Sequence, residues 1–144
     1  MRVDFYQLTR DPAERVVPQL AEATLRAGER LLVVAEAPDL LARIGRGLWQ
    51  NTAESFLAHG AAGAAHDARQ PILLGTTTEA ANGARYCILA DGLWREAGDM
   101  ARIFLLFPPD RIDDARGTWR VLGKRDGVER RYWRQDGGKW VEGP

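Results

Sequence analysis

Two periods of hydrophobic residues alternate along the N-terminal part of the chain. Residues 2–8 and the continuously apolar run at 31–35 predict strands. Between them apolar residues recur every three and four positions, which predicts a helix for which Asp11-Pro12 offers an N-cap and a proline in the first turn. Residues 38–49 repeat the helical spacing. This order predicts a right-handed βαβ unit and a mostly parallel sheet.

Three further apolar runs predict buried strands in the same sheet, at residues 71–75, 85–90 and 101–107. Before the first of them, residues 51–65 show neither the helical nor the strand period. We expect this segment to be a connecting loop with little secondary structure of its own. Loops of that length in compact domains are often functional.

The C-terminal part of the chain predicts a helix and a hairpin. Residues 110–123 have the helical spacing, and residues 128–135 predict a strand that turns at the Asp-Gly-Gly of 136–138 into a short return strand around Trp140. Together these elements predict a single α/β domain over residues 1–144. Its mostly parallel, Rossmann-like sheet is flanked by helices and followed by a C-terminal helix and a short hairpin.

The composition fits one globular domain without cross-links. A chain of 144 residues with 45% hydrophobic content is large enough to bury a core. The single cysteine, Cys87, excludes an internal disulfide, and its apolar neighbours predict a buried structural thiol. No window approaches the roughly 20 apolar residues of a membrane span, and the first residues do not resemble a signal peptide. We expect a cytoplasmic protein without a membrane partner.

No arrangement of residues predicts catalysis, a metal site or a cofactor. The glycines at 45–47 and 60–63 lack the spacing and the context of a phosphate-binding loop. The two histidines, His59 and His66, have no set of metal ligands at suitable spacing. The only serine, Ser55, lacks the flanking glycines of a nucleophile elbow. We expect a non-catalytic protein that holds no cofactor.

Positive charge is concentrated near the C-terminus. The whole chain has a formal net charge of zero, yet residues 116–140 contain eight basic residues against three acidic ones. Arg116, Arg120 and Lys124 recur every four residues, which places them on one face of the predicted last helix, with Trp119 beside them. The pattern leaves two interpretations open: a solvated helix face with a core tryptophan, or a dock for an acidic partner with an apolar end.

An aromatic pair follows the predicted second helix. Trp49 and Phe56, seven residues apart, bracket the start of the loop at 51–65. They could form an apolar surface patch for a partner or simply fill the core, and the sequence leaves both interpretations open.

Three blocks of the sequence resemble the chi subunit of bacterial DNA polymerase III. They are V-D-F-Y at 3–6, L-W-x-x-x-x-E-S-F-x-x-H at 48–59 and Y-W-R-Q-D-x-G-K-W at 132–140. Their order and separation fit that family from end to end. The resemblance implies a small α/β protein that binds no nucleotide and acts as an adaptor rather than as a catalyst.

The resemblance also implies two partners in the replication machinery. In that family, chi binds the C-terminal tail of single-stranded DNA-binding protein and joins the psi subunit, which tethers chi to the clamp loader. By position, Arg116, Trp119 and Arg120 match the tail-binding positions of the last helix. Lys124, one turn on, is added from helical spacing alone.

The aromatic pair acquires a role from the same resemblance. Trp49 and Phe56 match the pair that the family uses toward psi.

A different function stays open as an alternative: direct binding of single-stranded nucleic acid by the C-terminal aromatic and arginine residues, since bases stack on tryptophan and phosphates pair with arginine. The balanced net charge argues against duplex binding, so we expect any direct nucleic-acid contact to be weak or absent. A nucleotide-using enzyme has only the fold class in its favour.

Overall fold

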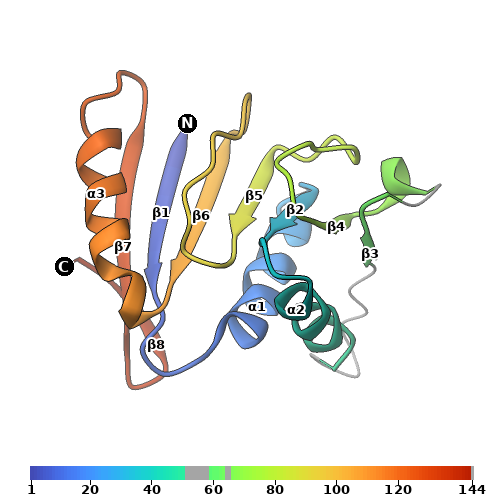
Figure 1. Cartoon of the computed structure of the whole chain (residues 1–144), viewed down its shortest axis with the longest axis horizontal. Coiled ribbons are helices and arrows are strands. Elements are labelled where there is room, and N and C mark those ends of the chain that lie inside the picture. Colours follow the sequence, from blue (N-terminus) through green and yellow to red (C-terminus); the bar gives the residue numbers. More distant parts are fainter. Residues whose placement is uncertain (51–58, 64–65, 144) are drawn as a thin grey trace.

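The structure is a computed structural model that describes residues 1–50, 59–63 and 66–143. Within them, eight strands form one sheet. The strands are β1 (Arg2–Gln7), β2 (Leu31–Val34), β3 (His59–Ala61), β4 (Ile72–Gly75), β5 (Tyr86–Leu89), β6 (Arg102–Phe107), β7 (Glu129–Asp136) and β8 (Lys139–Glu142). Their order across the sheet is β3-β4-β2-β5-β6-β1-β7-β8 (Figure 1). All neighbouring pairs are parallel except β7 and β8, which form an antiparallel hairpin.

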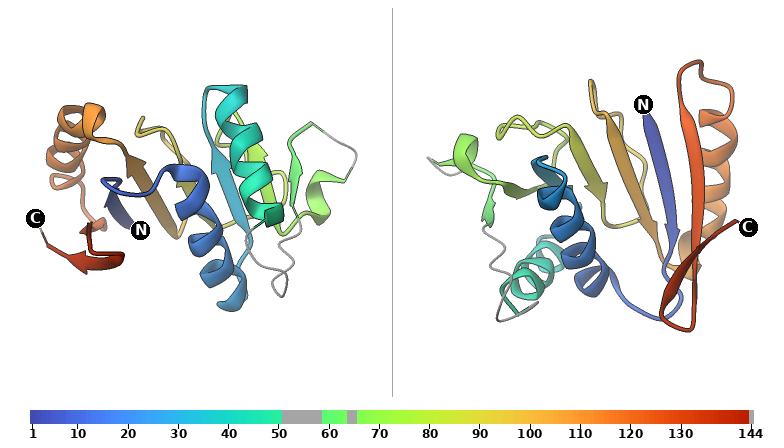
Figure 2. Two further views of the ribbon diagram at one scale, coloured as in Figure 1. Left: turned by 90° about the horizontal axis from the view of Figure 1, so that it is seen from below. Right: turned by 180° about the vertical axis from the view of Figure 1, so that it is seen from behind.

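Helices cover both faces of this sheet. They are α1 (Ala13–Arg26), α2 (Pro38–Gln50) and α3 (Ile112–Leu122), with short 3-10 helices η1 (Asp67–Arg69) and η2 (Pro109–Arg111). One core cluster joins α1 and α2 to the sheet, and a second cluster on the other face includes the buried side of α3. The views in Figure 2 show α1 and α3 on opposite sides of the strands. The predicted α/β class, with its mostly parallel sheet and C-terminal helix and hairpin, is confirmed.

Alternation along β1 assigns its side chains to the two faces. Val3 and Phe5 belong to the cluster under α3, whereas Tyr6 belongs to the cluster under α1. All four residues of β2 are buried, as expected for a strand covered on both faces. The predicted β-α-β order is present, but β1 and β2 are not neighbours, because β6 and β5 lie between them.

The predicted N-cap of α1 is wrong. The helix begins after Pro12, and no side chain caps its first turn. The carboxylate of Asp11 instead accepts a hydrogen bond from Nε2 of Gln135 at 2.9 Å. The Oε1 atom of the same glutamine accepts from the backbone N–H groups of Thr9, Arg10 and Asp11 at 3.3, 3.0 and 3.3 Å. A residue of β7 therefore ties the loop after β1 to the C-terminal hairpin.

Two other boundaries differ from the sequence prediction. Part of the expected loop at 51–65 is the strand β3, which pairs with β4 at the edge of the sheet. Its three residues, with a central glycine, carry no hydrophobic alternation that could have revealed it. Residues 51–58 and 64–65 lie outside the described residues. The last helix, expected at 110–123, begins only after the 3-10 turn η2 and ends at Leu122.

Cys87 lies in the middle of the sheet, on β5, and is buried as predicted. Burial raises the pKa of its thiol to about 12, although the charge of Arg95 opposes the rise. At pH 8 the native thiol is therefore almost entirely protonated, whereas an unfolded one, with a pKa near 8.5, is partly thiolate. We expect iodoacetamide to alkylate Cys87 roughly a thousandfold more slowly in native protein than in urea. Mass spectrometry of timed samples measures both rates, and equal rates would contradict the buried position.

None of the described helices combines the length and the apolar character that crossing a membrane requires.

Candidate functional site

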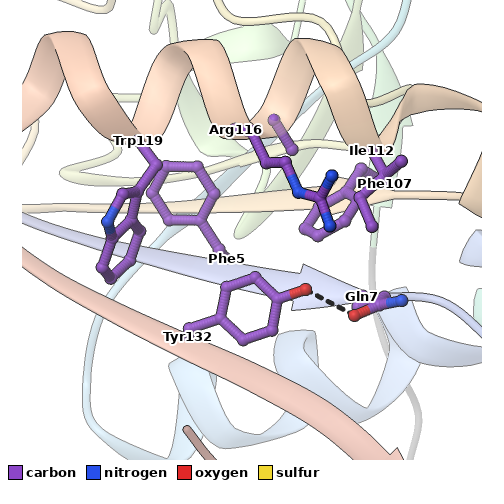
Figure 3. A pocket seen from close by; sticks show the side chains of 8 residues that line it. Phe5, Gln7, Phe107, Ile112, Arg116, Trp119 and Tyr132 are labelled. Carbon is purple, nitrogen blue, oxygen red and sulfur yellow. Dashed lines mark hydrogen bonds between the residues drawn. The ribbon is translucent and has the colours of Figure 1, made fainter. Parts of the chain in front are cut away.

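An apolar pocket of about 480 Å³ lies between α3 and the strands beneath it. Figure 3 shows side chains from α3 pointing toward others from β1 and β7. The pocket is lined by Phe5, Gln7, Phe107, Ile112, Ala115, Arg116, Trp119 and Tyr132. Most of its surface comes from carbon atoms, and Arg116, Gln7 and Tyr132 bring polar side chains to the lining. Such a mixture suits a ligand with an apolar body and one polar end.

Aromatic rings form one wall of this pocket. The ring of Trp119 contacts Phe5 edge to face, with centroids 5.1 Å apart, and Tyr132 in the same way at 6.2 Å. The guanidinium of Arg130 lies 4.3 Å from the Trp119 ring centroid and donates a 2.8 Å hydrogen bond to the Trp119 carbonyl oxygen. Trp119 is therefore half-buried and held from several sides. A core tryptophan and a tryptophan at a docking surface do not exclude each other, because this ring both anchors α3 and lines the pocket.

Arg116 supplies a positive charge at the same pocket. Its side chain is 66% exposed, and its guanidinium lies 3.9 Å from the carboxylate of Asp113, which is itself 96% exposed. A pair this long and exposed is weak, so the guanidinium stays available to a ligand. The Tyr132 hydroxyl donates a hydrogen bond to Oε1 of Gln7. Burial raises the pKa of Tyr132, and the charge of Arg116 opposes the rise.

The other two predicted basic residues line a different depression. Arg120 and Lys124 lie beside Gly117, Val121, Gly123 and Arg130, on the side of α3 away from the pocket. Val121 at this depression is 55% exposed. Lys124 follows the end of α3, so the helical spacing used to predict it does not apply there. The four predicted residues thus form two adjacent groups, with Arg130 contacting Trp119 in one and lining the other.

Trp49, the member of the predicted aromatic pair that the structure describes, lies far along the sheet from this pocket. Trp49, in the last turn of α2, is 67% exposed, and its ring meets that of His59 edge to face at 6.0 Å. A pocket between α2 and β3, lined by His59, Leu41 and their neighbours, is close by. Phe56 lies outside the described residues, so its position relative to Trp49 stays a prediction.

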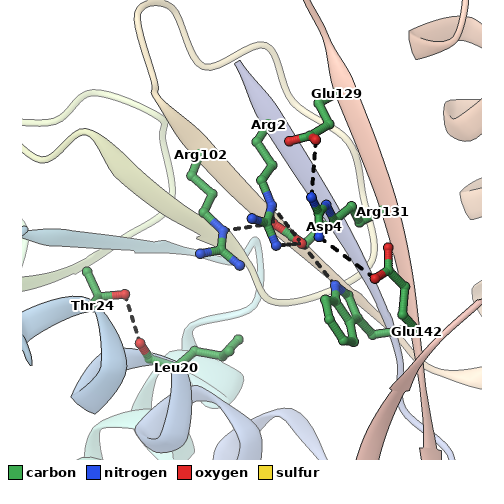
Figure 4. A network of polar contacts seen from close by, with 9 residues as sticks. Arg2, Asp4, Leu20, Thr24, Arg102, Glu129, Arg131 and Glu142 are labelled. Atoms are coloured by element: carbon green, nitrogen blue, oxygen red, sulfur yellow. Dashed lines mark hydrogen bonds and ion pairs between the residues drawn. The ribbon is translucent and has the colours of Figure 1, made fainter. Parts of the chain in front are cut away.

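On the opposite face of β1, a buried carboxylate joins three strands (Figure 4). Asp4 has no exposed side-chain surface, and it pairs with Arg2 at 2.9 Å and with Arg102 of β6 at 2.8 Å. The indole N–H of Trp133, on β7, donates to the same carboxylate at 2.9 Å. Trp133 also stacks on Tyr6, with ring centroids 6.1 Å apart. The aromatic and arginine residues of this face are thus largely engaged with one another.

Several of these pocket residues were missed by the sequence analysis. Gln7 and Phe5 share a face of β1, and the alternation of that strand indicates as much. Tyr132 and Arg130 come from β7, whose register pairs Phe5 with Tyr132. Nothing local in the sequence reveals which strand lies beside β1. Among the residues that the structure describes, no group of three or more His, Cys, Asp or Glu could hold a metal ion.

The sequence matches a family model, whereas a search of curated proteins found no match to the chain. A family model described as "DNA polymerase III chi subunit, HolC" matches residues 1–129, which leaves nearly all of the β7–β8 hairpin beyond the matched segment. The match spans well over half of the sequence and includes the whole of α3. The chain therefore belongs to the family of the DNA polymerase III chi subunit, HolC.

Proposed function

We propose that this chain links DNA polymerase III to single-stranded DNA-binding protein by binding that protein's acidic C-terminal tail at α3. The members of its family are accessory subunits of DNA polymerase III, so the chain has an accessory role in DNA replication. The observation that supports binding of the tail at α3 is the apolar pocket beside this helix, with the exposed side chain of Arg116 on its lining. Accessory subunits of this kind are generally non-catalytic, and we propose the same of this chain.

The tail has the chemistry that this pocket suits. It is acidic and ends in an apolar residue with a free carboxylate. The aromatic wall at Trp119 accommodates the apolar side chain, and Arg116 pairs with the carboxylate through charge-assisted hydrogen bonds. Preceding acidic residues of the tail pass over α3 toward Arg120 and Lys124, which have no ion pair with any described residue. These exposed contacts weaken with salt.

Calorimetric titration with a peptide copying the tail tests the proposal. We expect saturable binding by the wild-type protein that weakens between low and high salt. Arg116→Ala should weaken it roughly tenfold, because one charge-assisted contact contributes about 1.5 kcal/mol. Arg15→Ala is the matched control, since this exposed arginine lies on α1, on the other face of the sheet. No binding by the folded wild-type protein, or equal losses in the two variants, would refute the proposed site.

Direct binding of single-stranded nucleic acid has less support. The cations beside Trp133 are engaged: Arg2 and Arg102 pair with Asp4, and Arg131 pairs with Glu129 and Glu142. A strand of nucleic acid needs free cations and free ring faces. Strong, peptide-independent binding of a labelled oligonucleotide by the purified protein would favour this alternative over the adaptor.

A second docking surface is proposed at the other end of the sheet. The exposed indole of Trp49 lies on α2 beside a pocket at β3, an arrangement suited to an apolar partner surface. We propose that Trp49, together with Phe56, contacts a psi subunit that tethers the chain to the clamp loader.

A further inference from the structure

The polar side of the pocket beside α3 includes a glutamine and a tyrosine to which the proposed binding of the tail gives no role. Gln7 lies on β1 at the carboxyl end of that strand, beside Phe107 on one neighbouring strand and Arg134 on the other. Its amide faces the pocket together with the hydroxyl of Tyr132 and the guanidinium of Arg116 (Figure 3). The three groups form a small polar patch on an otherwise apolar lining.

Hydrogen bonding fixes what the Gln7 amide offers to a ligand. The Tyr132 hydroxyl donates to Oε1, which orients the amide with its oxygen toward Tyr132. The Nε2 group makes no hydrogen bond with any residue that the structure describes, and Gln7 is only half-buried. Two N–H donors therefore remain beside the five donors of the Arg116 guanidinium. Exposed Arg134, next to Gln7 in the β1–β7 register, adds positive charge on the same face.

We infer that Gln7, oriented by Tyr132, is a specificity-determining residue that makes this pocket select a peptide ending in a free carboxylate. A carboxylate only accepts hydrogen bonds, so it satisfies both Nε2 and the guanidinium. A peptide ending in a carboxamide presents two N–H groups of its own to these donors and leaves polar groups unpaired. The inference rests on the proposed function, because it assumes that an acidic peptide enters this pocket.

Tyr132 is the positioning residue of this arrangement. It lies on β7, so the C-terminal hairpin completes the pocket by holding the amide of a β1 residue. Without its hydroxyl, the Gln7 amide is free to turn and present its oxygen, which repels a carboxylate. The hairpin thus contributes to ligand choice without contacting the carboxylate itself.

The test compares two forms of one peptide, with several aspartates and a C-terminal phenylalanine, as the free acid and as the C-terminal amide. We expect the wild-type protein to bind the acid roughly tenfold more tightly than the amide. Gln7→Glu keeps the shape and the acceptor for Tyr132 but replaces the donor by an anion. It should weaken binding of the acid about thirtyfold and of the amide only about threefold, so the preference disappears. Tyr132→Phe, which keeps the ring but releases the Gln7 amide, should reduce the preference by weakening binding of the acid more than binding of the amide.

The ratio of the two affinities separates this inference from the proposed function. A purely structural effect of either substitution changes binding of both peptides equally and leaves the ratio at its wild-type value. An unchanged ratio in Gln7→Glu, or a wild-type protein that binds acid and amide alike, overturns the role of Gln7. If binding is still saturable and weakens with salt, the proposed adaptor function stands in that case. Failure of the folded wild-type protein to bind either peptide overturns both.

Discussion

Replacing Asp4 by alanine is expected to destabilise the protein by about 3 to 5 kcal/mol, the range measured when one partner of a buried ion pair is removed. The side chain of Asp4 has no exposed surface, and those of Arg2 and Arg102 are only 29% and 25% exposed. The substitution leaves these two guanidinium groups close together without a counter-charge. It also removes the acceptor of the Trp133 indole N–H. Because the contacts join β6, β1 and β7, the loss affects three adjacent strands of the sheet.

Urea denaturation followed by tryptophan fluorescence measures this effect. Asp99→Ala is a suitable control, because Asp99 is exposed and has no hydrogen bond or ion pair with a described residue, so its change should stay within about 0.5 kcal/mol. Trp133→Phe removes the N–H donor and part of the ring that stacks on Tyr6, and it should cost about 1 to 2 kcal/mol. If Asp4→Ala and Asp99→Ala unfold at the same urea concentration, the buried network does not stabilise the sheet as described.

The elements of the fold are largely readable from the sequence, because burial leaves a direct pattern. The run Leu31–Val34 is buried on both faces and is continuously apolar, and α1 buries one side and has the matching spacing. The edge strand His59–Ala61 escaped prediction since its position depends on backbone pairing with β4 rather than on buried side chains. Periodicity reports burial, so an element with little burial gives little signal.

Pairing between distant segments is a different kind of information. The contacts of Gln7 with Tyr132, and of Asp4 with Trp133, join residues more than 120 positions apart, and each depends on β7 lying beside β1. A lone aspartate in an apolar strand suggests a buried polar network, but the sequence does not say which cations pair with it. The polar side of the pocket, which completes the candidate site, could therefore not be predicted from the sequence.

The predicted basic face of the last helix was correct only in part, for a geometric reason. Each step of four residues advances about 40° around a helix, since a turn takes 3.6 residues. Arg120 is therefore rotated to one side of Arg116, while Trp119 lies to its other side. Arg116 and Trp119 thus turn toward the strands and line the pocket, whereas Arg120 faces the neighbouring depression. Spacing alone identified the helix side but not the direction in which the sheet lies.

Trp119→Ala is expected to affect stability and peptide binding together. The ring packs against Phe5 and Tyr132 and under Arg130, so its removal should cost about 3 kcal/mol, at the lower end for a tryptophan because the side chain is only half-buried. The same substitution removes the aromatic wall that takes the apolar end of the tail peptide. We therefore expect it to abolish detectable binding in calorimetry. Val121→Ala, on the exposed side of the same helix, should change stability by less than about 0.5 kcal/mol.

The conservative variant Trp119→Phe separates the two effects. Phenylalanine keeps an aromatic edge against Phe5 but fills less of the pocket, so we expect a loss of about 1 to 2 kcal/mol in stability and of severalfold in affinity. Circular dichroism at the titration temperature must first show that both variants are folded. Wild-type affinity in a folded Trp119→Ala protein would mean that the peptide binds elsewhere, whereas lost binding with unchanged stability would mean that the ring does not anchor α3. Only a joint loss, graded from alanine to phenylalanine, agrees with a ring that both holds the helix and forms the pocket.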